Sequence, residues 1–144
     1  MKFNFRLEKV LNFIRIRETL KKMEVATETQ KLRFIEGQHE SLIQSMRSTL
    51  SMQSEKLSIG TEWLSYQTQK IAWDSKESVR LEKLMNEQKQ LLEDKMYELN
   101  RIILRRKGIE SVREKRYAEY KFEQNRKAQK TLDENFQLLK GRKS

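Results

Sequence analysis

The feature that most limits the fold of this chain is the absence of proline, a residue that would interrupt a helix wherever it fell in the interior. Only four of the 144 residues are glycine and 8% are aromatic, so sheets and turn-rich folds are disfavoured. Apolar residues make up 36% of the chain, which can cover one stripe along a helix but not several buried layers. The charges are mixed rather than collected in blocks, which disfavours disorder. The sequence therefore predicts an all-α protein in which long helices pair along narrow stripes.

A turn between two long helices is indicated by residues 57–63. Gly60 suits a left-handed position just past a helix end, Thr61 can cap the next helix, and Glu62 would lie at the positive end of its dipole. We therefore expect one antiparallel coiled-coil hairpin over 1–144, with helix one at about 5–56, the turn at about 57–62 and helix two at about 63–138, where helix two extends beyond the pair. The alternative is one unbroken helix with an interior glycine, which would cost only about 1 kcal/mol.

The first arm carries a seam of side chains at alternating steps of three and four residues, which is the spacing of a coiled coil. Its apolar members are Leu7, Leu11, Ile14, Val25, Leu32, Ile35, Leu42 and Met46. Polar residues that weaken the pair and can set its register occupy the same phase at Glu18, Lys21, Glu28 and His39. Leu20, Met23 and Phe34 lie outside this phase, which indicates a drifting stripe or a second contact face.

The second arm repeats apolar residues at helical spacing, with Gln88 and Lys95 as polar interruptions. The apolar members are Leu81, Leu84, Met85, Leu91, Leu92, Leu99, Ile102, Ile103, Ile109 and Val112. If the chain folds back near Gly60, residue 7 lies opposite about residue 112. We therefore expect helix two to continue without a partner from Arg113 onward.

Charge divides the chain into three parts. Residues 1–35 carry nine Lys and Arg against four Asp and Glu, residues 36–99 carry eight against eleven, and residues 100–144 carry fourteen against six, so the net charges are +5, −3 and +8. A fold-back at Gly60 brings the two basic ends together, and we expect that end to attract acidic partners. The turn end would carry Trp63, Tyr66 and Trp73 as a partner surface. Two alternatives stay open: the charges form a solvated surface, and the aromatic residues close the end of the hairpin.

No set of catalytic or metal-binding residues can be assembled from the sequence. There is no cysteine, which excludes thiolate metal sites and cysteine nucleophiles, and the one histidine, His39, lies in the phase of the seam. No glycine-rich phosphate loop is present. We therefore expect a protein that is not an enzyme and that binds no cofactor and no metal. No apolar run approaches the about 20 residues of a membrane span, so we also expect a soluble, intracellular protein.

Three short segments carry a family resemblance. They are residues 5–11 (FRLEKVL), followed by Arg15, Arg17 and Glu18, then residues 63–67 (WLSYQ), and residues 129–134 (QKTLDE). They resemble the N-terminal pattern, the aromatic segment and the C-terminal ending of the FliJ family, the small coiled-coil component of the flagellar type III export apparatus. The chain departs from the family pattern at Gln69 and Lys70, where an apolar residue would extend the aromatic segment.

The resemblance implies a coiled coil similar to the central stalk of rotary ATPases. Its terminal ends would enter the ring of the export ATPase, promote ring assembly and activity, and link the ring to the membrane export gate; the protein would also handle export chaperones. It implies a cytoplasmic location, with association to the inner membrane only through these partners. The ring-facing residues would be Arg6, Lys9, Arg15, Arg17, Arg105, Arg106, Arg113, Lys115 and Arg116. The gate-facing residues would be Trp63, Tyr66 and Trp73.

A basic coiled-coil scaffold that binds nucleic acid, or another acidic partner, is the alternative function, because a pI near 9.8 suits contacts with phosphate. Positive residues alternate with Glu along residues 105–123, however, and no RNA-recognition, zinc or helix-turn-helix signature accompanies them. We therefore expect no nucleic acid among the partners.

Overall fold

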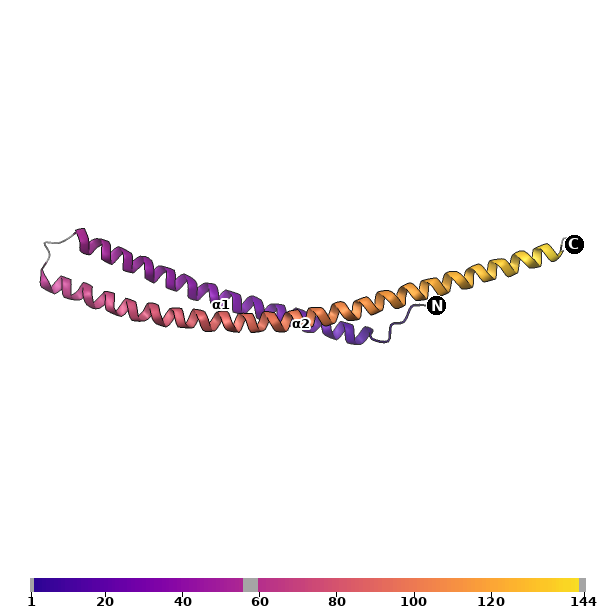
Figure 1. The fold of residues 1–144 in the computed structure, drawn as a ribbon, viewed down its shortest axis with the longest axis horizontal. Helices are drawn as coiled ribbons and strands as arrows, with labels where there is room; N and C mark the ends of the chain where they lie inside the picture. The colour runs from indigo at the N-terminus through magenta and orange to yellow at the C-terminus, as the bar shows by residue number, and fades with distance from the viewer. Residues whose placement is uncertain (1, 56–59, 143–144) are drawn as a thin grey trace. The chain divides into compact units, whose positions relative to one another are not determined.

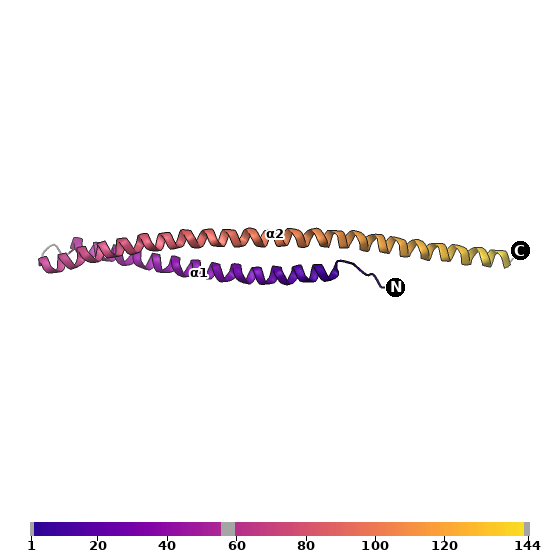
Figure 2. The same ribbon diagram turned by 90° about the horizontal axis from the view of Figure 1, so that it is seen from below.

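The protein is all-α, as the sequence predicts, and its two long helices pack against each other as a helical hairpin (Figure 1). The computed structural model describes residues 2–55 and 60–142. Helix α1 spans Glu8–Glu55 and helix α2 spans Thr61–Arg142. Figure 2 shows the same pair from a second direction, with α1 again alongside α2. Acidic residues lie in the first turn of each helix and basic residues in the last turn of α2, which matches the polarity of the helix dipole.

The start of α2 differs from the expectation. Gly60 does not adopt a positive φ, and its carbonyl accepts hydrogen bonds from the backbone N–H groups of Trp63 and Leu64 at 3.2 and 3.3 Å. Gly60 is therefore the residue that precedes the first helical turn, and Thr61 is the first helical residue rather than the cap. Residues 57–59 of the expected turn lie outside the described residues.

The chain forms two compact units. The terminal unit consists of Met1–Thr19 together with Asn100–Ser144, and the central unit consists of Leu20–Leu99. Each unit therefore contains a segment of α1 paired with a segment of α2.

Contacts inside each unit show that the helices run antiparallel. In the terminal unit, Glu8 and Arg113 form an ion pair of 2.9 Å, close to the expected pairing of residue 7 with about residue 112. In the central unit, Lys21 meets Glu98 at 2.8 Å, and His39, further along α1, meets Ser78, earlier in α2, at 3.3 Å. The partner number falls as the α1 number rises, which is the signature of antiparallel pairing.

The seam predicted for α1 is confirmed from Leu11 onward. Every predicted member from Leu11 to Met46 is buried or half-buried, including the polar ones. The prediction that Leu7 belongs to the seam is wrong. Leu7 is 36% exposed, because α1 begins at Glu8 and the helical spacing does not extend to residue 7. Leu20, Met23 and Phe34 are exposed, as their position outside the phase indicates.

The seam of α2 is partly confirmed and starts earlier than predicted. Gln88 and Lys95 are half-buried, as predicted. The prediction that Leu91 and Val112 belong to the seam is wrong. Both are exposed, because their neighbours Leu92 and Arg113 occupy the seam positions. Nearer the start of α2, three polar residues that the sequence analysis missed are buried, namely Gln67, Asp74 and Ser78.

Helix α2 extends beyond the pair, as predicted, and every residue from 125 to 142 is exposed. The expectation that it is unaccompanied already from Arg113 onward is wrong. The ring of Phe3 lies 5.2 Å from the ring of Tyr117 and 5.5 Å from that of Tyr120, and Phe5 is 5% exposed. The non-helical residues before α1 therefore pack against α2 past the point where α1 begins.

Candidate partner-binding surfaces

Charge is segregated between the two units. The terminal unit holds nineteen Lys and Arg against eight Asp and Glu, a net charge of +11, and the central unit holds twelve against thirteen, a net charge of −1. All nine cations predicted to face an acidic partner belong to the terminal unit. The basic character of the protein therefore comes from this unit alone.

Three of the nine predicted cations hold the terminal unit together. Arg113 pairs with Glu8 at 2.9 Å, and Arg15 pairs with Glu110 at 3.2 Å. Arg106 pairs with Glu18, which is 6% exposed and therefore needs a nearby cation to stay ionised at low cost. These three arginines join α1 to α2, and the sequence analysis did not foresee that structural role.

The ionisation of these pairs follows from their hydrogen bonds. The bond to Glu18, together with a second bond to Glu110, raises the pKa of Arg106 above its ordinary value despite some desolvation. Burial acts to raise the pKa of Glu110, but the hydrogen bonds from Arg15 and Arg106 outweigh it and leave that pKa below its ordinary value. Both groups are therefore charged at neutral pH and committed to each other.

The other six predicted cations are exposed and form no ion pair with any residue in the described ranges 2–55 and 60–142. They are Arg6, Lys9, Arg17, Arg105, Lys115 and Arg116. These six, rather than all nine, make up the basic surface of the terminal unit that can meet a partner.

The predicted aromatic residues lie near the start of α2 in the central unit. Trp73 is 72% exposed and Tyr66 is 64% exposed, whereas Trp63 is half-buried. Tyr66 and Trp73 are seven residues apart and so share one face of the helix, and Arg80 continues that face one heptad further on. We call Tyr66 and Trp73 the aromatic face.

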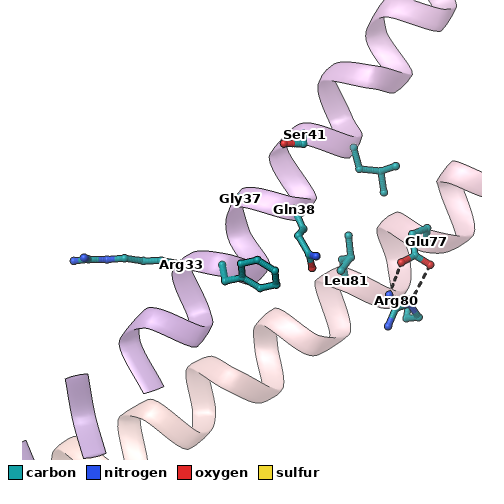
Figure 3. A pocket seen from close by; sticks show the side chains of 9 residues that line it. Arg33, Gly37, Gln38, Ser41, Glu77, Arg80 and Leu81 are labelled. Atoms are coloured by element: carbon teal, nitrogen blue, oxygen red, sulfur yellow. Dashed lines mark hydrogen bonds and ion pairs between the residues drawn. The ribbon is translucent and has the colours of Figure 1, made fainter. Parts of the chain in front are cut away.

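A groove of about 670 Å³ lies where α1 and α2 meet in the central unit, and Arg80 is among the residues that line it. Figure 3 shows Gln38 and Leu81 between the helices and Arg33 pointing away from α2. Gly37 and Ser41 leave the α1 wall low, and no atom comes within 4 Å of the position a side chain at Gly37 would take. On the α2 side, Glu77 accepts a hydrogen bond from Arg80 at 3.0 Å. The helical spacing in the sequence places Phe34 outside the seam, and Phe34 lines this groove. The spacing did not indicate the groove itself.

His39 lies in the seam. It is half-buried, with its Nε2 at 3.3 Å from the Ser78 hydroxyl and 3.5 Å from the Glu82 carboxylate. Among the described residues there is no group of three or more His, Cys, Asp or Glu residues that could hold a metal ion. The polar contacts of His39 are those of a seam residue that joins the two helices.

Comparisons with protein-family models, with curated proteins and with solved structures give no match for this chain. Within the part of the chain that the structure describes, neither helix is long and apolar enough to cross a membrane.

Proposed function

We propose that this chain is a non-enzymatic component of the flagellar type III export apparatus, of the FliJ type. The terminal unit binds the export ATPase and promotes assembly and activity of its ring. The aromatic face of the central unit contacts the membrane export gate, and the protein also handles export chaperones. It acts in the cytoplasm and associates with the inner membrane through these partners.

The observation that carries the proposal is the concentration of charge in the terminal unit. A net charge of +11, with six cations committed to no ion pair among the described residues, is a surface that is steered toward an acidic partner and held by many weak contacts. The segment that resembles the FliJ N-terminal pattern supports it, because Phe5 and Leu11 of that segment are buried and Glu8 pairs with Arg113. Residues of this N-terminal segment thus join the start of α1 to α2 within the terminal unit.

The ring contact is tested by reversing the charge of exposed cations only. In the variant Lys9→Glu, Arg17→Glu, Arg105→Glu, Arg116→Glu, the pairs of Arg15, Arg106 and Arg113 stay intact. Each exposed contact contributes about 0.2–1 kcal/mol, so four reversals should weaken the contact with a purified export ATPase, and with it the stimulation at limiting protein, by about fourfold or more. High salt should weaken the native contact in the same direction.

The matched control is four reversals at exposed cations of the central unit, Arg47→Glu, Lys76→Glu, Lys83→Glu and Lys89→Glu. This variant should stimulate the ATPase as the native chain does, and circular dichroism should show equal helicity for both variants. Equal stimulation by the terminal-unit variant and the native chain would show that the terminal unit is not the ring-binding end. A steep salt dependence of DNA affinity, with no ATPase binding, would favour the nucleic-acid scaffold instead.

The gate contact is tested at the aromatic face. Trp73→Ala should reduce binding to the isolated gate protein, because exposed tryptophans often anchor interfaces, and it should leave helicity unchanged. Val79→Ala is the control, since Val79 is also exposed on the same helix. If Trp73→Ala melts the protein but leaves gate binding per folded molecule unchanged, the aromatic residues close the hairpin end and are not a gate surface.

A further inference from the structure

The residues before α1 form a strap against α2 in the terminal unit. We define the strap as residues 2–7, which are not helical. The ring of Phe3 meets Tyr117 edge-on with centroids 5.2 Å apart and lies 5.5 Å from Tyr120. Phe5 is buried, and Glu8 at the start of α1 secures the end of the strap through Arg113. The strap therefore covers part of α2 beyond the point where α1 begins.

This cover is weaker than the helix pair that it continues. A non-helical segment must be ordered residue by residue without the internal hydrogen-bond ladder of a helix, so it opens before the paired helices do. The strap is anchored mainly by the two phenylalanines, and Tyr117 stays 42% exposed beneath it. Tyr117 is also in contact with the Lys121 ammonium, whose Nζ lies 5.1 Å from the ring centroid. The aromatic surface under the strap is thus only partly covered.

The charge of the strap does not match the surface that it covers. The strap contains Lys2 and Arg6 and no acidic residue. The stretch of α2 from 113 to 121 contains four cations and two carboxylates. A basic segment therefore lies on a basic stretch, and an acidic segment would be attracted to the same place.

A hollow beside the strap extends this surface along α2. It has a volume of about 790 Å³, and Tyr120 in its wall is shared with the strap contact. Three cations line it together with two carboxylates, namely Lys115, Arg116, Lys127, Glu119 and Glu123. Aromatic surface bordered by cations suits a helix that carries an apolar face and acidic flanks.

We propose that the strap is a displaceable cover, and that an acidic helix of the ATPase ring replaces it along residues 113–124 of α2, packing on Tyr117 and Tyr120. This inference rests on the proposed function of the terminal unit. While the strap is closed, part of this surface is covered, so the apparent affinity for the ring is lowered in proportion to the fraction of molecules that are open.

The test fixes the strap in place by a reversible crosslink. The chain has no cysteine, so Phe3→Cys with Tyr120→Cys supplies one unique pair, which a short cleavable thiol crosslinker can join. The crosslinked chain should need about tenfold more protein for half-maximal stimulation of the purified export ATPase than the same chain after cleavage. The matched control, Lys21→Cys with Glu98→Cys, joins α1 to α2 in the central unit, where the native side chains form an ion pair of 2.8 Å. Cleavage of this crosslink should not change the concentration needed for half-maximal stimulation.

A second variant weakens the strap instead. Phe3→Ala removes its contacts with both tyrosines and should lower the half-maximal concentration by about threefold. Equal stimulation before and after cleavage of the Phe3→Cys, Tyr120→Cys crosslink would overturn the inference, and so would weaker stimulation by Phe3→Ala, which would make the strap itself a ring contact. In both cases the native chain still stimulates the ATPase and the proposed function stands. Absence of stimulation by the native chain would overturn the proposed function and this inference with it.

Discussion

Two stretches of the central unit bury the same heptad positions with opposite chemistry. The aliphatic stretch has half-buried Val25, Leu32 and Ile35 on α1, and buried Leu81 followed by half-buried Leu84 and Met85 on α2. The polar stretch, nearer the start of α2, buries Gln67, Asp74 and Ser78 on α2 and Thr49 on α1, each less than 9% exposed. In this stretch the aromatic residues Tyr66 and Trp73 face outward. Helical phase therefore determines which positions are buried, whereas residue type determines how much the burial stabilises the pair.

The polar stretch carries a cost that the aliphatic stretch does not. Oε1 of Gln67 and Oδ2 of Asp74 are buried and accept no hydrogen bond from the described residues. A buried acceptor without a donor loses its hydration with no replacement, which costs about 1–3 kcal/mol. Polar residues at seam positions weaken a coiled coil for the same reason. The polar stretch should therefore be the less stable part of the central unit, next to the aromatic face that we propose as the gate contact.

The largest expected effect is at the junction of the two stretches. Leu81 is 4% exposed, the lowest value among the described apolar residues of the central unit, so Leu81→Ala should lower the free energy of unfolding by about 2–3 kcal/mol. Urea unfolding followed by circular dichroism measures this loss. Leu20→Ala, on the exposed side of α1, is the control and should change stability by less than about 0.5 kcal/mol. Equal losses from the two variants would mean that the aliphatic stretch does not carry the stability of the unit.

A smaller effect of the opposite sign is expected in the polar stretch. Asp74→Leu removes an unpartnered carboxylate oxygen and adds apolar surface to the seam, so the free energy of unfolding should rise by about 1–2 kcal/mol. The control Asp94→Leu alters an exposed carboxylate of the same helix and should not stabilise the protein. Destabilisation by Asp74→Leu would show that Asp74 has a favourable partner and would remove the distinction between the two stretches.

The sequence predicts the fold well because one periodic signal governs it. In α1 the steps of three and four residues identify even the polar seam members, such as Glu18 and Lys21. In α2 the predicted seam starts only at Leu81, because that prediction was based on apolar residues alone. Counting back in sevens from Leu81 reaches Asp74 and Gln67, so the phase contained the polar stretch although hydrophobicity did not reveal it.

The candidate site is less predictable from the sequence. Composition shows which residues are cations, but whether a cation is paired depends on the register between the helices and on side-chain direction. This is why Arg106 and Arg113 were grouped with Arg105 and Arg116, although only the last two are exposed and unpaired among the described residues. The contact of Phe3 with Tyr117 was missed because the strap is not helical and no periodicity marks its packing.

The smallest expected effect is a pH dependence located in the aliphatic stretch. A hydrogen bond from Gln88 lowers the pKa of Glu28 below its ordinary value, and hydrogen bonds from Lys21 lower the pKa values of Glu98 and Glu24 in the same way. A carboxyl group whose pKa is lower in the folded state stabilises the protein above its unfolded pKa, and the contribution is lost as pH falls through the folded pKa. In acid, the aliphatic stretch should therefore lose part of the stability by which it exceeds the polar stretch.

This dependence can be measured by comparing Glu28→Gln with the native chain at two pH values. The native protein should be the more stable at pH of about 7, and the difference in urea midpoint should shrink in acid, as pH falls through the lowered folded pKa of Glu28. Glu87→Gln is the control, since Glu87 is exposed on α2, and its midpoint should follow that of the native chain at both values. A difference for Glu28→Gln that stays constant between the two pH values would mean that Gln88 holds residue 28 through its backbone carbonyl, 3.1 Å away, and not through the charged side chain. The aliphatic stretch would then remain more stable than the polar stretch in acid.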